Sequence, residues 1–224
     1  MEHIAHIHSE FPTKFGIPRQ SGLAESLCAE IVFEEKYRNP DALRGIEGFS
    51  HLWLIWEFSQ AKRSNWSPTV RPPRLGGNER MGVFATRSPF RPNPIGLSCV
   101  KLEEVRWEEM VLVVSGADLL DGTPIFDIKP YLPYADSHPE AMGGFANSMP
   151  EAQLQVECRS ELLEKLPPRQ RRALLEVLSQ DPRPSYQEDP ERVYGMAFAG
   201  FDVRFRIAED RLTVLELLPL KESE

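Results

Sequence analysis

The chain has 224 residues, of which 41% are hydrophobic and 27% charged, and its formal net charge is −8. These values are typical of a globular protein and exclude a disordered chain, and the length allows one main domain with a smaller second one. Because the first residues lack a signal-peptide pattern and no window approaches 18 consecutive apolar residues, we expect a cytoplasmic protein that makes no contact with a membrane.

The predicted elements of the first part are mostly strands. Alternating apolar residues predict a strand over 27–33, and a near-continuous apolar run predicts another over 51–58. Between them, Asn39 as N-cap, Pro40 in the first turn and Gly45 at the end predict one short helix. Further strands are predicted at 81–86, 95–105, 111–115 and 125–128. Since no long helices separate these strands and no GxGxxG motif follows one, we expect a closed or strongly curled antiparallel sheet, not a Rossmann fold.

The composition changes near residue 138. Residues 138–151 are rich in Gly, Asn, Ser and Pro, so we predict a linker there, between a first domain at 1–137 and a second at 152–224. The second domain is predicted to be a small α+β module. Its elements are a helix from about Pro168, a strand over 193–207 and a strand over 212–218, the strands joined by a turn at Glu209 and Asp210.

Cysteine and histidine residues give no pattern for a metal site. Cys28, Cys99 and Cys158 are odd in number and widely spaced, which fits neither a disulfide framework nor a CxxC motif, so we expect three buried thiols. His6 and His8 would share one face of a strand, but no cluster of carboxylates or cysteines accompanies them. We therefore predict no metal.

Basic residues are concentrated in one segment. Residues 62–91 carry a charge of +6, whereas the remainder of the chain carries −14. A local cationic patch can contact phosphates whatever the total charge, although arginines also decorate long loops without binding anything. Trp66 lies inside this segment and is a candidate for an RNA contact or a subunit contact, whereas Trp53 and Trp56 are expected in the core.

The end of the basic segment is unusually stiff. Between Pro89 and Pro94 there are three prolines within six residues, which fix the backbone before any ligand arrives. The loop presents the guanidinium groups of Arg87 and Arg91, and Gly96 would allow a ligand or a strand to approach the backbone closely. Composition alone does not identify the ligand.

This loop is one of several blocks that occur in a fixed order. They are GIPRQSG (16–22), FSHLWLIW (49–56), RPPRLGG (71–77), RSPFRPNPIGLS (87–98) and DLLDGTPIFDIKPYLPYAD (118–136). The series resembles the TsaA-like (TrmO) family of tRNA methyltransferases. The resemblance is detailed over residues 3–136 and reaches loosely to DPRPSY (181–186), a segment that would either be a rigid turn or contact RNA or the active site.

The resemblance implies a single-sheet antiparallel β-barrel that binds S-adenosylmethionine, forms a homodimer, and methylates N6 of N6-threonylcarbamoyladenosine at position 37 of threonine tRNA. It also implies a set of cofactor-binding residues. They are Pro18, Arg19, Gln20, His51, Arg87, Leu97, Asp121, Gly122, Thr123 and Pro124. The chemistry is suitable, because an arginine can pair with the cofactor carboxylate, a carboxylate can hold its ribose or ammonium group, and apolar side chains can flank adenine.

Methyl transfer to N6 requires alignment of the reacting atoms and would be helped by a base, because the N6 lone pair is delocalised. The candidate bases are Asp121, Asp127, Glu57 and His51, of which we predict Asp121 and Asp127 as catalytic. Alternatively, Asp121 belongs to an ordinary Asp-Gly turn, Asp127 caps a strand and His51 is structural.

For RNA binding we predict Arg71, Arg74, Arg91 and Trp66, with Arg91 facing either RNA or a partner subunit. The rival hypothesis is a module that binds S-adenosylmethionine or RNA without catalysis, since function resides in the site and not in the fold. The intact blocks, with both Asp121 and Asp127, favour the enzyme.

Overall fold

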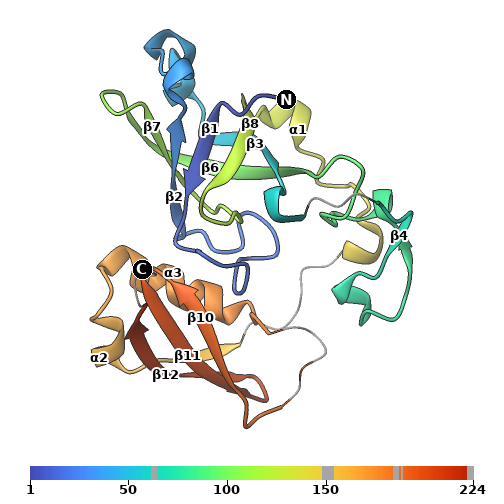
Figure 1. The fold of residues 1–224 in the computed structure, drawn as a ribbon, viewed down its shortest axis with the longest axis vertical. Helices are drawn as coiled ribbons and strands as arrows, with labels where there is room; N and C mark the ends of the chain where they lie inside the picture. The colour runs from blue at the N-terminus through green and yellow to red at the C-terminus, as the bar shows by residue number, and fades with distance from the viewer. Residues whose placement is uncertain (62–64, 148–153, 184–186, 188, 221–224) are drawn as a thin grey trace.

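The computed structural model describes residues 1–61, 65–147, 154–183, 187 and 189–220. Two bodies with separate sheets lie one above the other in Figure 1, the first drawn from blue to yellow and the second from orange to red. No helix among the described residues is long and apolar enough to cross a membrane.

The first body is a closed barrel in which every neighbouring pair of strands is antiparallel, in the order β1-β2-β7-β6-β3-β8. This confirms the expected mostly β, single-sheet barrel. Its strands are β1 (Ala5–His8), β2 (Cys28–Phe33), β3 (His51–Glu57), β6 (Ile95–Arg106), β7 (Val111–Ser115) and β8 (Thr123–Pro130). Because side chains alternate along a strand, Leu52, Leu54 and Trp56 of β3 point into the buried core, and the residues between them face outward.

Two local predictions in this body were wrong. Residues 81–86 do not form one strand: β5 (Met81–Gly82) pairs with β4 (Thr69–Val70), and a 3-10 turn, η6 (Val83–Ala85), follows because the Val83 carbonyl accepts from both the amide and the hydroxyl of Thr86. The short helix after Asn39 is also a 3-10 turn, η2 (Pro40–Leu43), although Asn39 caps it as expected. Gly45, at φ +87°, begins the next turn, η3 (Ile46–Gly48).

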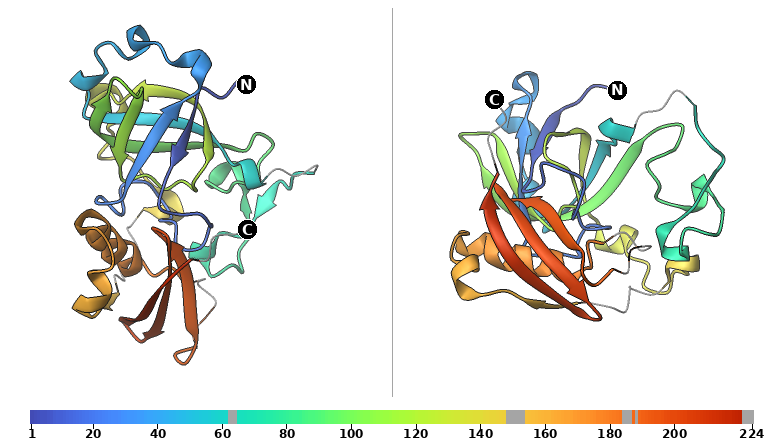
Figure 2. Two further views of the ribbon diagram at one scale, coloured as in Figure 1. Left: turned by 60° about the vertical axis from the view of Figure 1, so that its left-hand side comes forward. Right: turned by 60° about the horizontal axis from the view of Figure 1, so that its bottom comes forward.

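The β4–β5 hairpin projects to one side of the barrel in both Figure 1 and Figure 2. The remaining short elements of the first body are 3-10 turns and one turn of α-helix. They are η1 (Glu35–Tyr37), η4 (Ser59–Ala61), η5 (Pro73–Leu75), α1 (Pro133–Asp136) and η7 (Gly144–Ala146).

The second body, here called the C-terminal unit, is a four-stranded sheet in the order β10-β11-β12-β9, covered by helices. Its elements are β9 (Gln155–Glu157), α2 (Ser160–Leu163), α3 (Pro168–Ser179), β10 (Val193–Phe198), β11 (Phe201–Ala208) and β12 (Arg211–Pro219). Helix α3 begins at the predicted proline and buries Leu174 and Leu178. The hairpin turn at Glu209 and Asp210 is confirmed.

The predicted strand over 193–207 is in fact two strands. The chain reverses at Ala199 and Gly200, whose φ angles of +50° and +80° are incompatible with a continuous strand. A turn with a non-glycine residue at positive φ gives only a weak sequence signal, which explains the error.

The three cysteines are unpaired thiols, each only partly buried, so the expectation of buried thiols was wrong. Partial burial raises the pKa of each thiol above its ordinary value. The His6 ring contacts the Glu34 carboxylate, and His8 lies 3.3 Å from Asp121. Over the part of the chain that the structure describes, no group of three or more histidine, cysteine or carboxylate side chains is placed to hold a metal.

Candidate functional site

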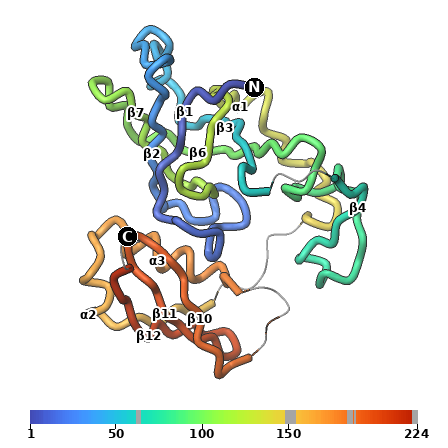
Figure 3. The backbone as a smooth tube through the Cα atoms, viewed as in Figure 1, coloured from blue at the N-terminus to red at the C-terminus, as the bar shows by residue number. Residues whose placement is uncertain are grey.

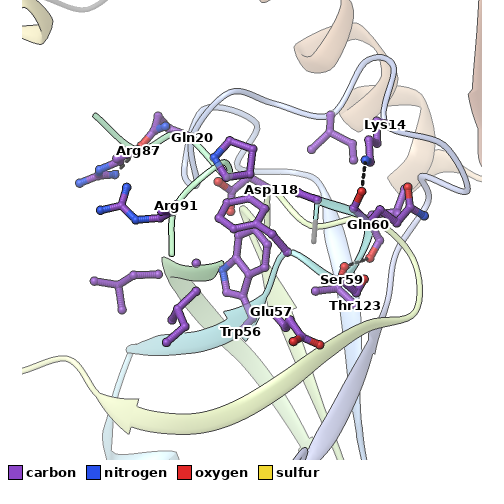
Figure 4. Close-up of a pocket in the computed structure, with 18 of the residues that line it drawn as sticks. Lys14, Gln20, Trp56, Glu57, Ser59, Gln60, Arg87, Arg91, Asp118 and Thr123 are labelled. Atoms are coloured by element: carbon purple, nitrogen blue, oxygen red, sulfur yellow. Dashed lines mark hydrogen bonds between the residues drawn. The ribbon is translucent and has the colours of Figure 1, made fainter. Parts of the chain in front are cut away.

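A cleft of about 700 Å³ opens at the end of the barrel where β3 ends and β6 begins. Four segments that are distant in sequence form its walls: residues 14–20, residues 56–61 at the end of β3, residues 86–97, and residues 118–123. Figure 4 shows side chains from these segments pointing toward the same space. The volume is in the range of sites for small ligands and cofactors.

A buried chain of hydrogen bonds joins Trp56 and Asp118, two of the residues that line the cleft. Trp56 Nε1 donates to Ser98 Oγ at 2.9 Å, and Ser98 Oγ donates to Asp118 Oδ1 at 2.5 Å. Gly96 makes this arrangement possible, because a Cβ atom at this position would lie 2.2 Å from the Trp56 ring. The indole of Trp56 therefore lies directly against the backbone of β6 at Gly96. This agrees with the prediction that Gly96 allows a close approach to the backbone.

Asp118 is a cleft residue that the sequence did not identify. Burial raises the pKa of its carboxyl group, against the opposing effects of the Ser98 hydrogen bond and the nearby Arg87 charge. The only available signal was its place at the start of the DLLDGTP block, where the Asp121–Gly122 pair drew attention instead.

Cationic side chains outnumber carboxylates in the cleft. Lys14, Arg19, Arg87 and Arg91 line it, and the described carboxylates among its lining residues are Glu57 and Asp118. Arg87 donates to the Gln20 side chain, which in turn donates to the Arg19 carbonyl. Arg91 donates to the Thr86 carbonyl at 2.8 Å, which fixes its orientation. This environment favours ligands that carry negative groups.

The structure brings together six of the ten residues predicted to bind the cofactor. The six that line the cleft are Pro18, Arg19, Gln20, Arg87, Leu97 and Thr123; the four that do not are His51, Asp121, Gly122 and Pro124. His51 begins β3, whereas the cleft contains the residues that end it, so the two positions are roughly 20 Å apart along the strand. The His51 ring contacts the Ser50 hydroxyl at 2.9 Å and lies edge-on to the Tyr131 ring.

Of the four candidate bases, Glu57 alone is among the described residues that line the cleft. The Asp121 carboxylate accepts from the Ser9 amide at 3.0 Å and lies 3.3 Å from the His8 ring. Asp121 and Gly122 also lie in a tight turn, the alternative given for them, in which the Thr123 amide donates to the Leu120 carbonyl at 3.1 Å. The Asp127 carboxylate pairs with Lys129 at 2.9 Å and accepts from the Ile128 amide. Neither aspartate reaches the cleft in this chain.

The residues predicted to contact RNA extend outward from the cleft. Arg91 lines it, and its guanidinium lies 5.9 Å from the centre of the Phe84 ring. The Phe84 and Trp66 rings lie 6.0 Å apart and are 72% and 52% exposed. Arg71 and Arg74 are also exposed, beside the β4–β5 hairpin. Phe84 was missed because it fell inside a predicted strand, where a large apolar residue is expected to be buried.

The DPRPSY segment is described only in part, since residues 184–186 lie outside the described residues. Arg183 forms a two-pronged ion pair with Asp181, at 2.9 and 2.8 Å. The Arg183 carbonyl accepts from Arg19 at 3.4 Å, so this turn reaches the rim of the cleft.

Comparison with known proteins gives matches over almost the whole chain. The family model for the tRNA-methyltransferase O N-terminal domain matches residues 6–137, and the model for the TrmO C-terminal domain matches residues 151–220. A tRNA (adenine(37)-N6)-methyltransferase of Escherichia coli (strain K12) is 46% identical over 97% of both chains. One of Eikenella corrodens is 53% identical over 78% of this chain and 99% of that protein.

Solved structures agree with these matches. A crystal structure of TrmO from Pseudomonas aeruginosa superposes with a TM-score of 0.77 and 34% identity, covering 96% of each chain. The chain therefore belongs to the tRNA-methyltransferase O (TrmO) family.

Proposed function

We propose that this protein transfers a methyl group from S-adenosylmethionine to N6 of the adenosine at position 37 of tRNA. The observation that carries the proposal is the cationic cleft, which four of the family-like blocks build together at one end of the barrel. The names of the relatives that match nearly the full chain support the same reaction.

The residues of the cleft fit the cofactor. S-adenosylmethionine supplies an electrophilic methyl group on a positively charged sulfur, and it also carries a carboxylate, an ammonium group, a ribose and an adenine. Arg87 and Arg19 are suited to its carboxylate, Asp118 and Thr123 to hydroxyl or ammonium groups, and Leu97 to a face of the adenine.

Two carboxylates in the cleft can take up the proton that N6 loses. As the new N–C bond forms and the S–C bond breaks, N6 releases one proton and the cofactor becomes a neutral thioether. Glu57 and Asp118 are the described carboxylates that line the cleft. The raised pKa of Asp118 brings its proton affinity closer to that of an effective base near neutral pH.

The charge of the cleft also supports a finer choice of substrate. A threonylcarbamoyl group on N6 carries a carboxylate of its own, in addition to that of the cofactor. Among the described residues, four cationic side chains line the cleft, Lys14, Arg19, Arg87 and Arg91, which is enough for one at each of the two carboxylates. We therefore propose N6-threonylcarbamoyladenosine of threonine tRNA as the substrate.

An RNA surface adjoins the cleft. Phe84 and Trp66 present exposed ring faces, with Arg91 connecting them to the cleft. Bases next to a target nucleotide can stack on such rings, while Arg71 and Arg74 contact phosphates.

The proposal includes a homodimer acting in the cytoplasm. Sedimentation velocity tests the dimer, and the exposed Tyr134 and Met142 are the first apolar positions to examine as its interface.

The experiment uses labelled S-adenosylmethionine with two tRNA preparations. One comes from cells that make the threonylcarbamoyl group but lack its methylation, and the other is an unmodified transcript. We expect label in threonine tRNA from the first preparation alone. If the cofactor binds but neither preparation gains label, the non-catalytic binding module becomes the better description.

A further inference from the structure

One wall of the cleft is a long loop that leaves the barrel at one strand, returns to it at the next, and is held between them by contacts with the C-terminal unit. Residues 9–27 connect β1 to β2 without forming a helix or strand, and their middle part contributes Lys14, Pro18, Arg19 and Gln20 to the cleft. In Figure 3 this loop, drawn in blue, descends from the barrel to the C-terminal unit. We call it the cofactor loop.

Apolar residues of the cofactor loop belong to the core of the C-terminal unit. Phe11, Ala24 and Leu27 are at most 1% exposed and lie in the same cluster as the buried residues of α3, β10, β11 and β12. The Phe11 ring meets Phe198 edge-on at 5.4 Å. The Phe15 ring lies parallel to that of Phe205 in β11, at 6.5 Å.

The loop backbone touches the sheet just before the cleft. Gly16 has φ +92°, and a Cβ atom on it would lie 2.1 Å from the sulfur of Met196 in β10. Only two residues separate Gly16 from Arg19 at the rim. A shift of the C-terminal sheet would therefore move the cofactor wall directly.

Polar contacts fix the loop on both sides of this point. On one side, the Ala199 amide donates to the Glu10 carbonyl at 3.0 Å, and Gln170 donates to the Glu10 side chain at 2.6 Å. On the other side, the amide and the hydroxyl of Ser26 each donate to the Glu176 carboxylate of α3 at 2.8 Å.

We infer that the C-terminal unit is a positioning element for S-adenosylmethionine binding, and that Glu176 acts in it by fixing the cofactor loop through Ser26. This rests on the proposed function. Ordering a loop without regular structure costs conformational entropy. Contacts with the C-terminal unit order the loop before the cofactor arrives. They thereby raise the fraction of molecules whose loop is already in the binding conformation.

The test compares variants that remove different contacts of the Glu176 carboxylate. Glu176→Ala removes both hydrogen bonds to Ser26. Arg172→Ala removes the ion pair at 2.8 Å between Arg172 Nε and Glu176 Oε1, and it leaves both Ser26 donors and the carboxylate that accepts from them. Glu176→Gln keeps one acceptor oxygen and serves as the conservative variant.

The main readout is the Kd of S-adenosylmethionine from calorimetry, with steady-state kinetics beside it. We expect Glu176→Ala to raise the Kd and the KM of the cofactor about tenfold, the effect of losing hydrogen bonds to a charged group. The value of kcat at saturating cofactor and the KM of tRNA should stay near wild type. Glu176→Gln should fall between, and Arg172→Ala should match wild type.

Hydrogen exchange supplies a readout that does not depend on the reaction. Faster exchange confined to the amides of residues 16–22 in Glu176→Ala supports positioning, whereas faster exchange throughout the C-terminal unit indicates a structural role only. A wild-type Kd with unchanged exchange in folded Glu176→Ala overturns the inference. If that variant does not fold, Gln170→Ala is used in its place. It removes the hydrogen bond from Gln170 to the Glu10 side chain, at the other end of the cofactor loop, and the same Kd and exchange measurements apply. If the wild type binds no cofactor, the proposed function fails, and the exchange experiment still tests the positioning.

Discussion

Replacing Gly96 with alanine would place a methyl group inside the ring of Trp56. The added Cβ atom would lie 2.2 to 2.5 Å from three ring atoms, and the ring is only 7% exposed, so it has little space into which to move. Overpacking of this kind costs about 1–3 kcal/mol. Displacing the indole also breaks its hydrogen bond to Ser98, worth about 1 kcal/mol. We expect a loss of about 2–4 kcal/mol in the free energy of unfolding, together with weaker cofactor binding.

Urea unfolding followed by tryptophan fluorescence measures the stability, and calorimetry measures the cofactor affinity. Gly82→Ala is the matched control, because Gly82 also lies in a strand and an added Cβ atom there meets nothing within 4 Å. The control should stay within about 0.5 kcal/mol of wild type. The reasoning is refuted if Gly96→Ala is equally stable and binds the cofactor with wild-type affinity.

Three further predictions concern Asp118 and the RNA surface. Folding raises the Asp118 pKa above its ordinary value of 3.8, so the folded protein favours the protonated carboxyl group. The contribution of this group to the free energy of unfolding is therefore present at low pH and is lost as the pH rises through the raised pKa. The free energy of unfolding of Asp118→Asn, measured in urea, should therefore rise relative to that of wild type as the pH increases from 3.8 through the raised pKa. A difference between the two proteins that stays constant with pH would contradict this. Replacing Arg71 and Arg74 together with alanine should reduce the salt dependence of tRNA binding by roughly one to two units of log–log slope without changing the cofactor Kd; an unchanged slope would indicate a structural role. Phe84→Ala should weaken tRNA binding by about 1–3 kcal/mol, while Phe84→Tyr retains most of it, and equal loss in both variants would exclude stacking.

Much of the barrel and part of the cleft were predictable from local sequence. Alternation in β2 and the apolar run of β3 reflect burial of one strand face, which any sheet of this kind requires. The blocks around Arg19, Arg87 and Thr123 identified residues on three of the four walls of the cleft.

The role of each side chain within a block was less predictable, because it depends on which end of a strand borders the cleft. His51 and Glu57 belong to one strand, yet only Glu57 is at the cleft. Asp118 and Asp121 belong to one block, but the register of the barrel gives Ser98 to the first and Ser9 to the second. Such pairings join residues 20 and 112 positions apart, which no local pattern encodes.

The attachment of the cofactor loop to the C-terminal unit was not predictable for the same reason. Ser26 and Glu176 are 150 residues apart, and the apolar residues of the loop follow neither the helical nor the strand period. The burial of these loop residues depends on the C-terminal unit, so it can be recognised only from the three-dimensional structure.

The attachment also has a consequence for biosynthesis. The barrel strands are complete once Pro130 has been made, whereas the core that receives Phe11 includes Leu217 of β12. Domains generally fold as they emerge from the ribosome, N-terminal part first. On the ribosome, the nascent barrel can therefore close while Phe11 and Leu27 still lack their partners, and the wall that carries Arg19 and Gln20 takes its final shape last. A premature stop between the two bodies would release a barrel whose cofactor site was never finished.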